Sequence, residues 1–231
     1  MQTIQKFAFE VYPYICLSVF LIGSWIRFDR EQYSWRSGSS QMLRAKQLRW
    51  GSNLFHVGVL AIFAGHFVGL LTPHEVYTGL GLTVEAKQMI AIVAGGVFGA
   101  VCWLGLTILL HRRLTDPRIR VTSTKMDIFV VLLLWVQLTL GLVTIPYSLE
   151  HSDGSVMLTL SHYVQHIVTL RGGEYEAISA LAWPYKTHLV LGFTMFLVFP
   201  FSRLVHIWSA PVGYVFRSYQ IVRRRGGAGH A

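Results

Sequence analysis

Four histidines stand out because they lie in the most apolar stretches of the sequence. Two of these stretches, residues 54–71 and 186–208, carry two histidines each: His56, His66, His188 and His206. The first stretch contains no Asp, Glu, Lys or Arg. Imidazole serves proteins as a metal ligand or a proton carrier, and inside a membrane it indicates a functional site by default. The four imidazoles are therefore the candidates for this chain's chemistry.

The composition favours a membrane protein. Of the 231 residues, 53% are hydrophobic and 13% are charged, and the mean hydropathy is +0.47. These values are not those of a soluble surface. A helix needs about 20 apolar residues to cross a bilayer, and in lipid the backbone has to satisfy its own hydrogen bonds. We predict one all-α integral membrane domain with five transmembrane helices, near residues 7–27, 51–71, 88–110, 128–145 and 186–208, followed by a basic cytoplasmic tail at 209–231.

The basic residues give the orientation of these helices. Most of the 20 Lys and Arg residues fall on one side of five alternating spans, whereas most of the acidic residues fall on the other. The positive-inside rule then places the N-terminus outside and the C-terminus in the cytoplasm. The net charge of +9 reflects topology and contact with anionic lipid, so we expect no nucleic-acid partner. Basic loops also suit an acidic cytoplasmic partner.

The orientation sorts the histidines into two pairs. The second predicted span runs outward and the fifth runs inward, so their histidines meet in reverse order. His56 and His206 form an inner pair near the cytoplasmic face. His66 and His188 form an outer pair nearer the opposite face.

The spacing within each span sets a geometric condition. Eighteen residues between His188 and His206 are five whole turns, which would put both on one helix face about 27 Å apart. Ten residues between His56 and His66 leave them about 15 Å and roughly 80° apart. The two spacings do not match, so we expect one of the helices to be bent or tilted, or the planes of any groups bound by the two pairs to be rotated. Pro200 is the obvious place for a kink.

Two histidine pairs at two depths are typical of a membrane cytochrome b with two haems. A zinc site would gather three or four ligands at one depth. Two imidazoles per iron leave no open axial position, which favours electron transfer over oxygen chemistry. With only Cys16 and Cys102, and no CxxCH motif, the haems would not be attached covalently. A proton relay remains the alternative.

Turn and cap residues predict several boundaries. Pro73 should stop the second span, and Thr124, three residues before Asp127, should cap the fourth. Pro146 should end the fourth span. Residues 156–170 should form an amphipathic surface helix, and the tail after Pro211 another.

Nearly the whole chain resembles the gamma subunit, the cytochrome b membrane anchor, of respiratory nitrate reductases. The resemblance rests on VYPYI, FLIGSWIRFD, SSQMLR, SNLFHVGVLAIFAGHFVGLLTPH, HRRLTDPR, GLVTIPYS and HLVLGFTMFLVFPFSRLVHIWSAPV. It includes all four intramembrane histidines. The departures from the family pattern concentrate in residues 75–85 and 150–184, which bear on the quinone entrance.

The resemblance implies two b haems, with the inner and outer histidine pairs as iron ligands. It implies that quinol is oxidised near the outer haem, and that electrons pass inward to an iron–sulfur subunit and then to a molybdenum catalytic subunit in a prokaryotic cytoplasmic membrane. The family also has a functionally implicated lysine at the motif of Lys87. A snorkelling membrane anchor is the competing interpretation of Lys87.

Further candidates come from residue type and position. Gly65, beside His66, would let a quinone ring approach closely, so Lys87, His66 and Gly65 form the predicted quinol site. Three arginines near the cytoplasmic surface suit the haem propionates, or else are topology and lipid contacts: Arg27, Arg112 and Arg203.

Two other functions remain open from the sequence. One is a dihaem b anchor of another quinone-linked complex, of the formate dehydrogenase or hydrogenase type. The other is a haem-free transporter or structural anchor in which the histidines relay protons.

Overall fold

The computed structural model describes residues 2–36, 43–172, 174–209 and 216. Within these residues all regular structure is helical, which confirms the predicted all-α class. In this part of the chain four helices are long and apolar enough to cross a membrane, and the number is five if a bent pair of segments forms one span. The predicted tail helix after Pro211 lies outside the described residues.

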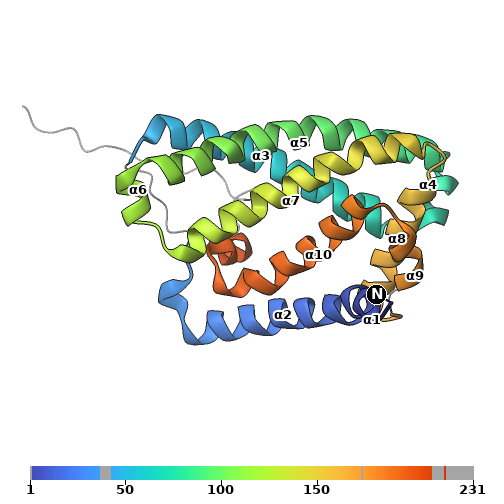
Figure 1. The fold of residues 1–231 in the computed structure, drawn as a ribbon, viewed down its shortest axis with the longest axis horizontal. Helices are drawn as coiled ribbons and strands as arrows, with labels where there is room; N and C mark the ends of the chain where they lie inside the picture. The colour runs from blue at the N-terminus through green and yellow to red at the C-terminus, as the bar shows by residue number, and fades with distance from the viewer. Residues whose placement is uncertain (1, 37–42, 173, 210–215, 217–231) are drawn as a thin grey trace, which may run out of the picture.

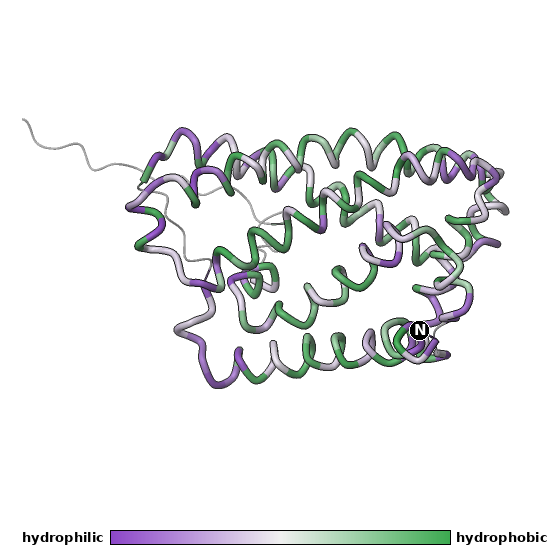
Figure 2. The backbone as a smooth tube through the Cα atoms, viewed as in Figure 1, coloured by the Kyte–Doolittle hydropathy of each residue, from purple (hydrophilic) through white to green (hydrophobic). Residues whose placement is uncertain are grey.

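The long helices run lengthwise and the short ones gather at the two ends (Figure 1). We call the end with α6 (Pro117–Val121) the α6 end. The opposite end, with α4 (His74–Gly79), α8 (Ser155–Val168) and α9 (Tyr175–Ala180), is the α8 end. Hydrophobic residues predominate along the middle of the long helices and hydrophilic ones at the ends (Figure 2), as membrane-crossing helices require.

The first span, Gln2–Arg30, is continuous but changes its winding near Pro13. It consists of α1 (Gln2–Lys6), a π-helical turn (Phe7–Val11) and α2 (Tyr12–Arg30). Pro13 has no N–H to donate to the carbonyl of Phe9, and its ring crowds the preceding turn. The π turn relieves this crowding, and the buried hydroxyl of Tyr163 on α8 donates to the Phe9 oxygen at 2.8 Å.

The second and third spans pack through small residues. They are α3 (Ala45–Leu71), which stops before Pro73 as predicted, and α5 (Val84–Thr115). A Cβ added to Gly58 would lie 2.6 Å from Cβ of Cys102, and one added to Gly105 would overlap the backbone nitrogen of Phe55. These glycines let the two backbones touch, as is common between membrane helices.

The fourth span, α7 (Lys125–Glu150), begins as predicted and ends later. Thr124 and Asp127 form a reciprocal capping box at its start. The prediction that Pro146 ends the span is wrong, because α7 continues through it. Thr144 donates to Gly141 O at 2.7 Å and Tyr185 donates to Thr144 O at 3.3 Å, close to the Leu142 carbonyl that Pro146 leaves without an N–H donor. Neighbouring helices and local hydroxyl groups make proline tolerable inside a membrane helix.

The fifth span is broken near Pro200. Its first part is α10 (Trp183–Val198), which passes into a 3-10 turn (Phe199–Phe201). A second 3-10 segment (Arg203–Ser209) follows at an angle of 84°. The predicted kink is therefore present, but it is a break, so residues 186–208 are not one straight helix.

The amphipathic helix predicted at 156–170 is confirmed as α8. Its buried face packs Tyr163 and Ile167 against Phe9 of the first span and Ile178 of α9. The α8 end is thereby closed by a small hydrophobic cluster that joins the start of the chain to the loop before α10.

Candidate metal centre

The outer pair is brought together by two helices that do not pack closely on each other. His66 comes from α3, which packs on α5 and α8, and His188 comes from α10, which packs on α7 and α2. Their ring centroids are 6.4 Å apart and the ring planes are inclined by 38°. The depth argument from the sequence predicted this meeting.

The separation of the outer pair fits one metal ion between two imidazoles. A metal–imidazole nitrogen bond is about 2 Å long, and the ring centre lies about 1 Å beyond the nitrogen, so two rings on opposite sides of one ion have centroids about 6 Å apart. No group of three or more His, Cys, Asp and Glu side chains in the described part of the chain is placed to hold a metal. The donor set is thus a pair of imidazoles, which would suit a haem iron.

The ring nitrogens are arranged so that Nε2 can ligate. Each of the four histidines donates its Nδ1–H to a backbone carbonyl: His56 to Ser52 at 2.7 Å, His66 to Ile62 at 2.9 Å, His188 to Gln137 at 3.1 Å, and His206 to Arg203 at 2.6 Å. This bond fixes the tautomer and leaves Nε2 as the electron-pair donor. His151 makes the same bond, to Tyr147, so the bond alone does not mark a ligand.

The two histidines of the inner pair, His56 and His206, are not brought together as those of the outer pair are. Among the described side chains, the rings of His56 and His206 are not in ring contact, unlike those of the outer pair. His206 lies on the 3-10 segment beyond the break, so the prediction that it shares a helix face with His188 is wrong. Because α3 is continuous, His56 and His66 keep their angular offset, and it is the fifth span that bends.

The three arginines all contact the protein near the α6 end. Arg27 donates to the carbonyls of Pro200 at 2.6 Å and Ser202 at 2.8 Å, and twice to Ser34. Arg203 forms an ion pair with Asp127 of α7 at 2.8 Å. The buried Arg112 donates to Leu43 O at 2.5 Å. Arg27 is thus occupied by the protein and holds the broken segment.

The predicted quinol residues lie in two different settings. Lys87, in the first turn of α5, is only 8% exposed, and its Nζ lies 3.9 Å from the ring centroid of Tyr77 on α4. This Nζ makes no hydrogen bond within the described structure. A Cβ added to Gly65 would meet nothing within 4 Å, so α3 is open beside His66.

Tyr77 was not predicted from the sequence as a site residue. In the sequence, Tyr77 is marked only by being an aromatic residue in the short linker before Lys87. Burial, with a smaller contribution from Glu75, raises the pKa of the Tyr77 hydroxyl, so the side chain stays a neutral phenol. The ring face stabilises the buried ammonium through a cation–π contact.

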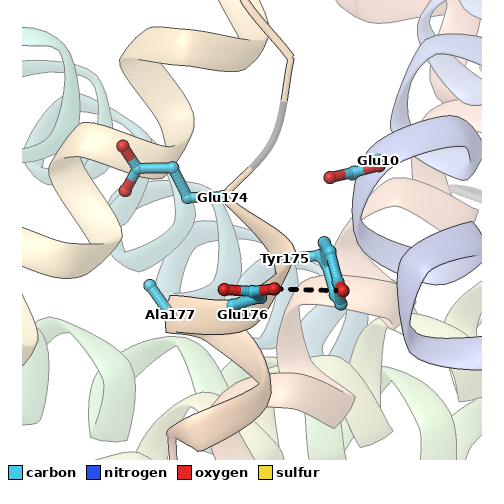
Figure 3. A pocket seen from close by; sticks show the side chains of 5 residues that line it. All are labelled: Glu10, Glu174, Tyr175, Glu176 and Ala177. Atoms are coloured by element: carbon cyan, nitrogen blue, oxygen red, sulfur yellow. Dashed lines mark hydrogen bonds between the residues drawn. The ribbon is translucent and has the colours of Figure 1, made fainter. Parts of the chain in front are cut away.

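A separate acidic hollow lies at the α8 end (Figure 3). It is lined by Glu10, Glu174, Tyr175, Glu176 and Ala177, and the Tyr175 hydroxyl donates to Glu176 at 3.2 Å. None of the four histidines lines it. We assign this hollow no part in the metal centre.

Comparison with known proteins gives consistent matches across the chain. A family model described as nitrate reductase gamma subunit matches residues 5–225. The chain is 52% identical to the respiratory nitrate reductase 1 gamma chain of Escherichia coli K12 over 225 residues, which cover 97% of this chain and 100% of that protein. It is 37% identical to the nitrate reductase gamma chain of Bacillus subtilis 168 over 215 residues, 93% of this chain and 96% of that one.

Proposed function

Since this chain belongs to the nitrate reductase gamma subunit family, we propose that it is a dihaem cytochrome b that oxidises quinol on the outer side of a prokaryotic cytoplasmic membrane. It passes the electrons inward to an iron–sulfur subunit and a molybdenum subunit, and nitrate is reduced on the latter. The proposal extends the family assignment by naming two cofactors, a substrate and a direction.

The outer histidine pair is the observation that carries the proposal. His66 and His188 are separated by a distance suited to one metal ion, and each uses Nδ1–H on a carbonyl, so Nε2 is the atom left to ligate. In His188 this atom lies 3.5 Å from the Gln137 amide nitrogen. When bound, a haem on two imidazoles supplies a one-electron carrier without an open axial position. His56 and His206 would hold the second haem, and the break at Pro200 gives their segment a separate orientation.

Lys87 suits the quinol site because of its charge and its surroundings. Oxidation of one quinol releases two electrons and two protons, and the quinol oxygen has to be held while they leave. A buried ammonium that keeps its N–H groups unused can donate to that oxygen, and the Tyr77 ring holds the ammonium in place. Gly65 leaves α3 without a side chain next to His66, which is where a flat ring has to approach.

The charge distribution supports the direction of transfer. The α6 end is rich in basic side chains from α5 and α6: Arg112, Arg113, Arg118 and Arg120. By the positive-inside rule this end faces the cytoplasm and anionic lipid, and the α8 end with Lys87 faces outward. The N-terminus is then outside, and the cytoplasmic partners dock at the α6 end.

Purification of the intact complex tests the proposal directly. Reduced-minus-oxidised spectra should show two b-type haems per chain, both reduced by added quinol. Cytoplasmic subunits containing iron–sulfur and molybdenum centres should copurify with the chain. A preparation that holds both partner subunits but no b-type absorption would overturn the cofactor assignment. Two haems that quinol does not reduce would overturn the quinol role while leaving the haems in place.

A further inference from the structure

We propose that Gln137 and Gly141 of α7 fix the ring orientation of His188 and so set the properties of the outer haem. The inference rests on the proposed function, because it takes His188 as a haem ligand. It adds two positioning residues on α7, a helix that carries none of the four proposed haem-ligating histidines.

His188 differs from the other three histidines in the source of its hydrogen-bond acceptor. His56, His66 and His206 each donate Nδ1–H to a carbonyl three or four residues earlier in their own segment. His188 donates instead to the Gln137 carbonyl on α7, at 3.1 Å. The orientation of this ring therefore depends on how α7 and α10 sit against each other.

The contact between the two residues is reciprocal. The Gln137 side-chain amide donates back to the His188 carbonyl at 3.0 Å. The same amide nitrogen lies 3.5 Å from Nε2 of His188, the ring atom left for the metal. Gln137 thus holds both the backbone and the ring of His188.

Two glycines make this close approach possible. A Cβ added to Gly141, one turn after Gln137, would lie 3.0 Å from Cε1 of His188. A Cβ added to Gly192, one turn after His188, would lie 3.2 Å from the Gln137 amide nitrogen. Each distance is tighter than ordinary van der Waals contact, so a methyl group at either position has to move the ring or the amide.

A bond to the second ring nitrogen controls the basicity and orientation of a metal-bound imidazole. Hydrogen bonding around the ligand is also one of the means by which a protein adjusts haem potential. The Gln137 side-chain amide holds the His188 backbone against α7, where the Gln137 backbone carbonyl receives the Nδ1–H, and Gly141 leaves room for the ring face. Loss of the amide, or a methyl group at Gly141, should therefore shift the His188 ring and affect the outer haem first. Among the described residues, neither His56 nor His206 makes such a contact with α7.

The test uses the intact complex with Gln137→Met, Gly141→Ala and the control Gly96→Ala. Methionine keeps the length of glutamine but removes its amide. Gly96 packs α5 against Ile145 of α7, and its added Cβ would make an ordinary contact of 3.7 Å. For each variant, redox titration gives the two haem midpoint potentials, and electron paramagnetic resonance gives the two low-spin ferric signals. His188→Ala identifies which signal belongs to the outer haem.

We expect Gln137→Met and Gly141→Ala to shift the potential and the resonance of the outer haem alone, and Gly96→Ala to shift neither. Loss of the outer haem alone in Gly141→Ala would also support the proposal. Unchanged signals in both variants, or equal shifts of both haems, would overturn it. If the complex with Gly141→Ala does not assemble, the result for Gln137→Met alone supports or overturns the proposal. Failure of the proposed function has a different result, because the unmutated complex would then lack b-type haem.

Discussion

Arg27 of α2 donates a hydrogen bond of 2.6 Å to the carbonyl of Pro200, at the point where the fifth span breaks. The same guanidinium donates to the Ser202 carbonyl at 2.8 Å. The break frees backbone carbonyls that a continuous helix would use, and those of Pro200 and Ser202 belong to buried residues that need a partner. Arg27 satisfies these carbonyls and ties the segment that carries His206 to α2.

Replacement of Arg27 by Leu should loosen the segment beyond the break. A hydrogen bond to a charged group contributes about 1.5–3 kcal/mol, so loss of even one weakens the bent conformation more than about tenfold. We expect the inner haem to be lost or to shift in potential while the outer haem is unaffected, as measured by redox titration. Arg30→Leu is the control, because Arg30 pairs only with its exposed neighbour Asp29 in the described structure. Equal effects of the two substitutions would refute this role.

Substitutions in the two histidine pairs should each remove a different haem. On the proposed assignment His66 and His188 would hold the same haem, so His66→Ala and His188→Ala should each abolish the outer haem and quinol oxidation and leave one b-type signal. His56→Ala and His206→Ala should remove the other signal and block transfer to the cytoplasmic subunits. Haem content per chain and potentiometric titration measure the result. His162→Ala, on the surface helix α8, is the control. Retention of two haems in all four variants would contradict the ligand assignment.

The long helices could be predicted from hydropathy because each crosses the membrane independently. The meeting of His66 and His188 could be predicted because two antiparallel spans leave few depths at which their histidines coincide. The kink at Pro200 was also predicted, but the passage of α7 through Pro146 could not be. Both lie in apolar spans, and residue type alone does not distinguish a proline that a helix passes through from one at which it breaks.

The contacts that position His188 and Lys87 could not be predicted from the sequence either. Gln137 and Gly141 affect His188 only because α7 and α10 approach closely, and nothing in the sequence of α7 indicates which face meets the ring. The same holds for Tyr77 and Lys87, which are ten residues apart and meet because the chain turns between α4 and α5. Depth alone therefore predicted the meeting of the outer pair, whereas the rings of His56 and His206 are not in contact in the described structure and the contacts between helices could not be predicted.

The contributions of Lys87 and Tyr77 can be distinguished by the expected effects of their substitutions on quinol oxidation. Lys87→Met removes the charged donor and should lower quinol oxidation about ten- to a hundredfold, with both haems retained. Tyr77→Phe keeps the ring face and should have little effect. Tyr77→Leu removes a cation–π contact of about 0.5–2 kcal/mol and should raise KM about two- to thirtyfold.

Steady-state oxidation of a quinol analogue, with haem content measured in parallel, checks these expectations. Lys6→Gln is the control, an exposed lysine at the same end of the molecule. Normal quinol oxidation in Lys87→Met would exclude the lysine from the site. An equal loss in Tyr77→Phe and Tyr77→Leu would show that the hydroxyl, and not the ring face, is required.

The contact between α3 and α5 should tolerate no side chain at Gly105. A Cβ there overlaps the backbone of Phe55, which lies in the helix carrying both His56 and His66. Gly105→Val therefore has to separate the two helices, and overpacking of this kind costs about 1–3 kcal/mol or more. Because α3 would supply one ligand to each proposed site, we expect the occupancy of both haems to fall together. Gly96→Ala, which adds an ordinary contact, should retain full occupancy, and haem content per chain after purification measures the difference. Loss of a single haem in Gly105→Val would mean that the two halves of α3 are held independently of this contact.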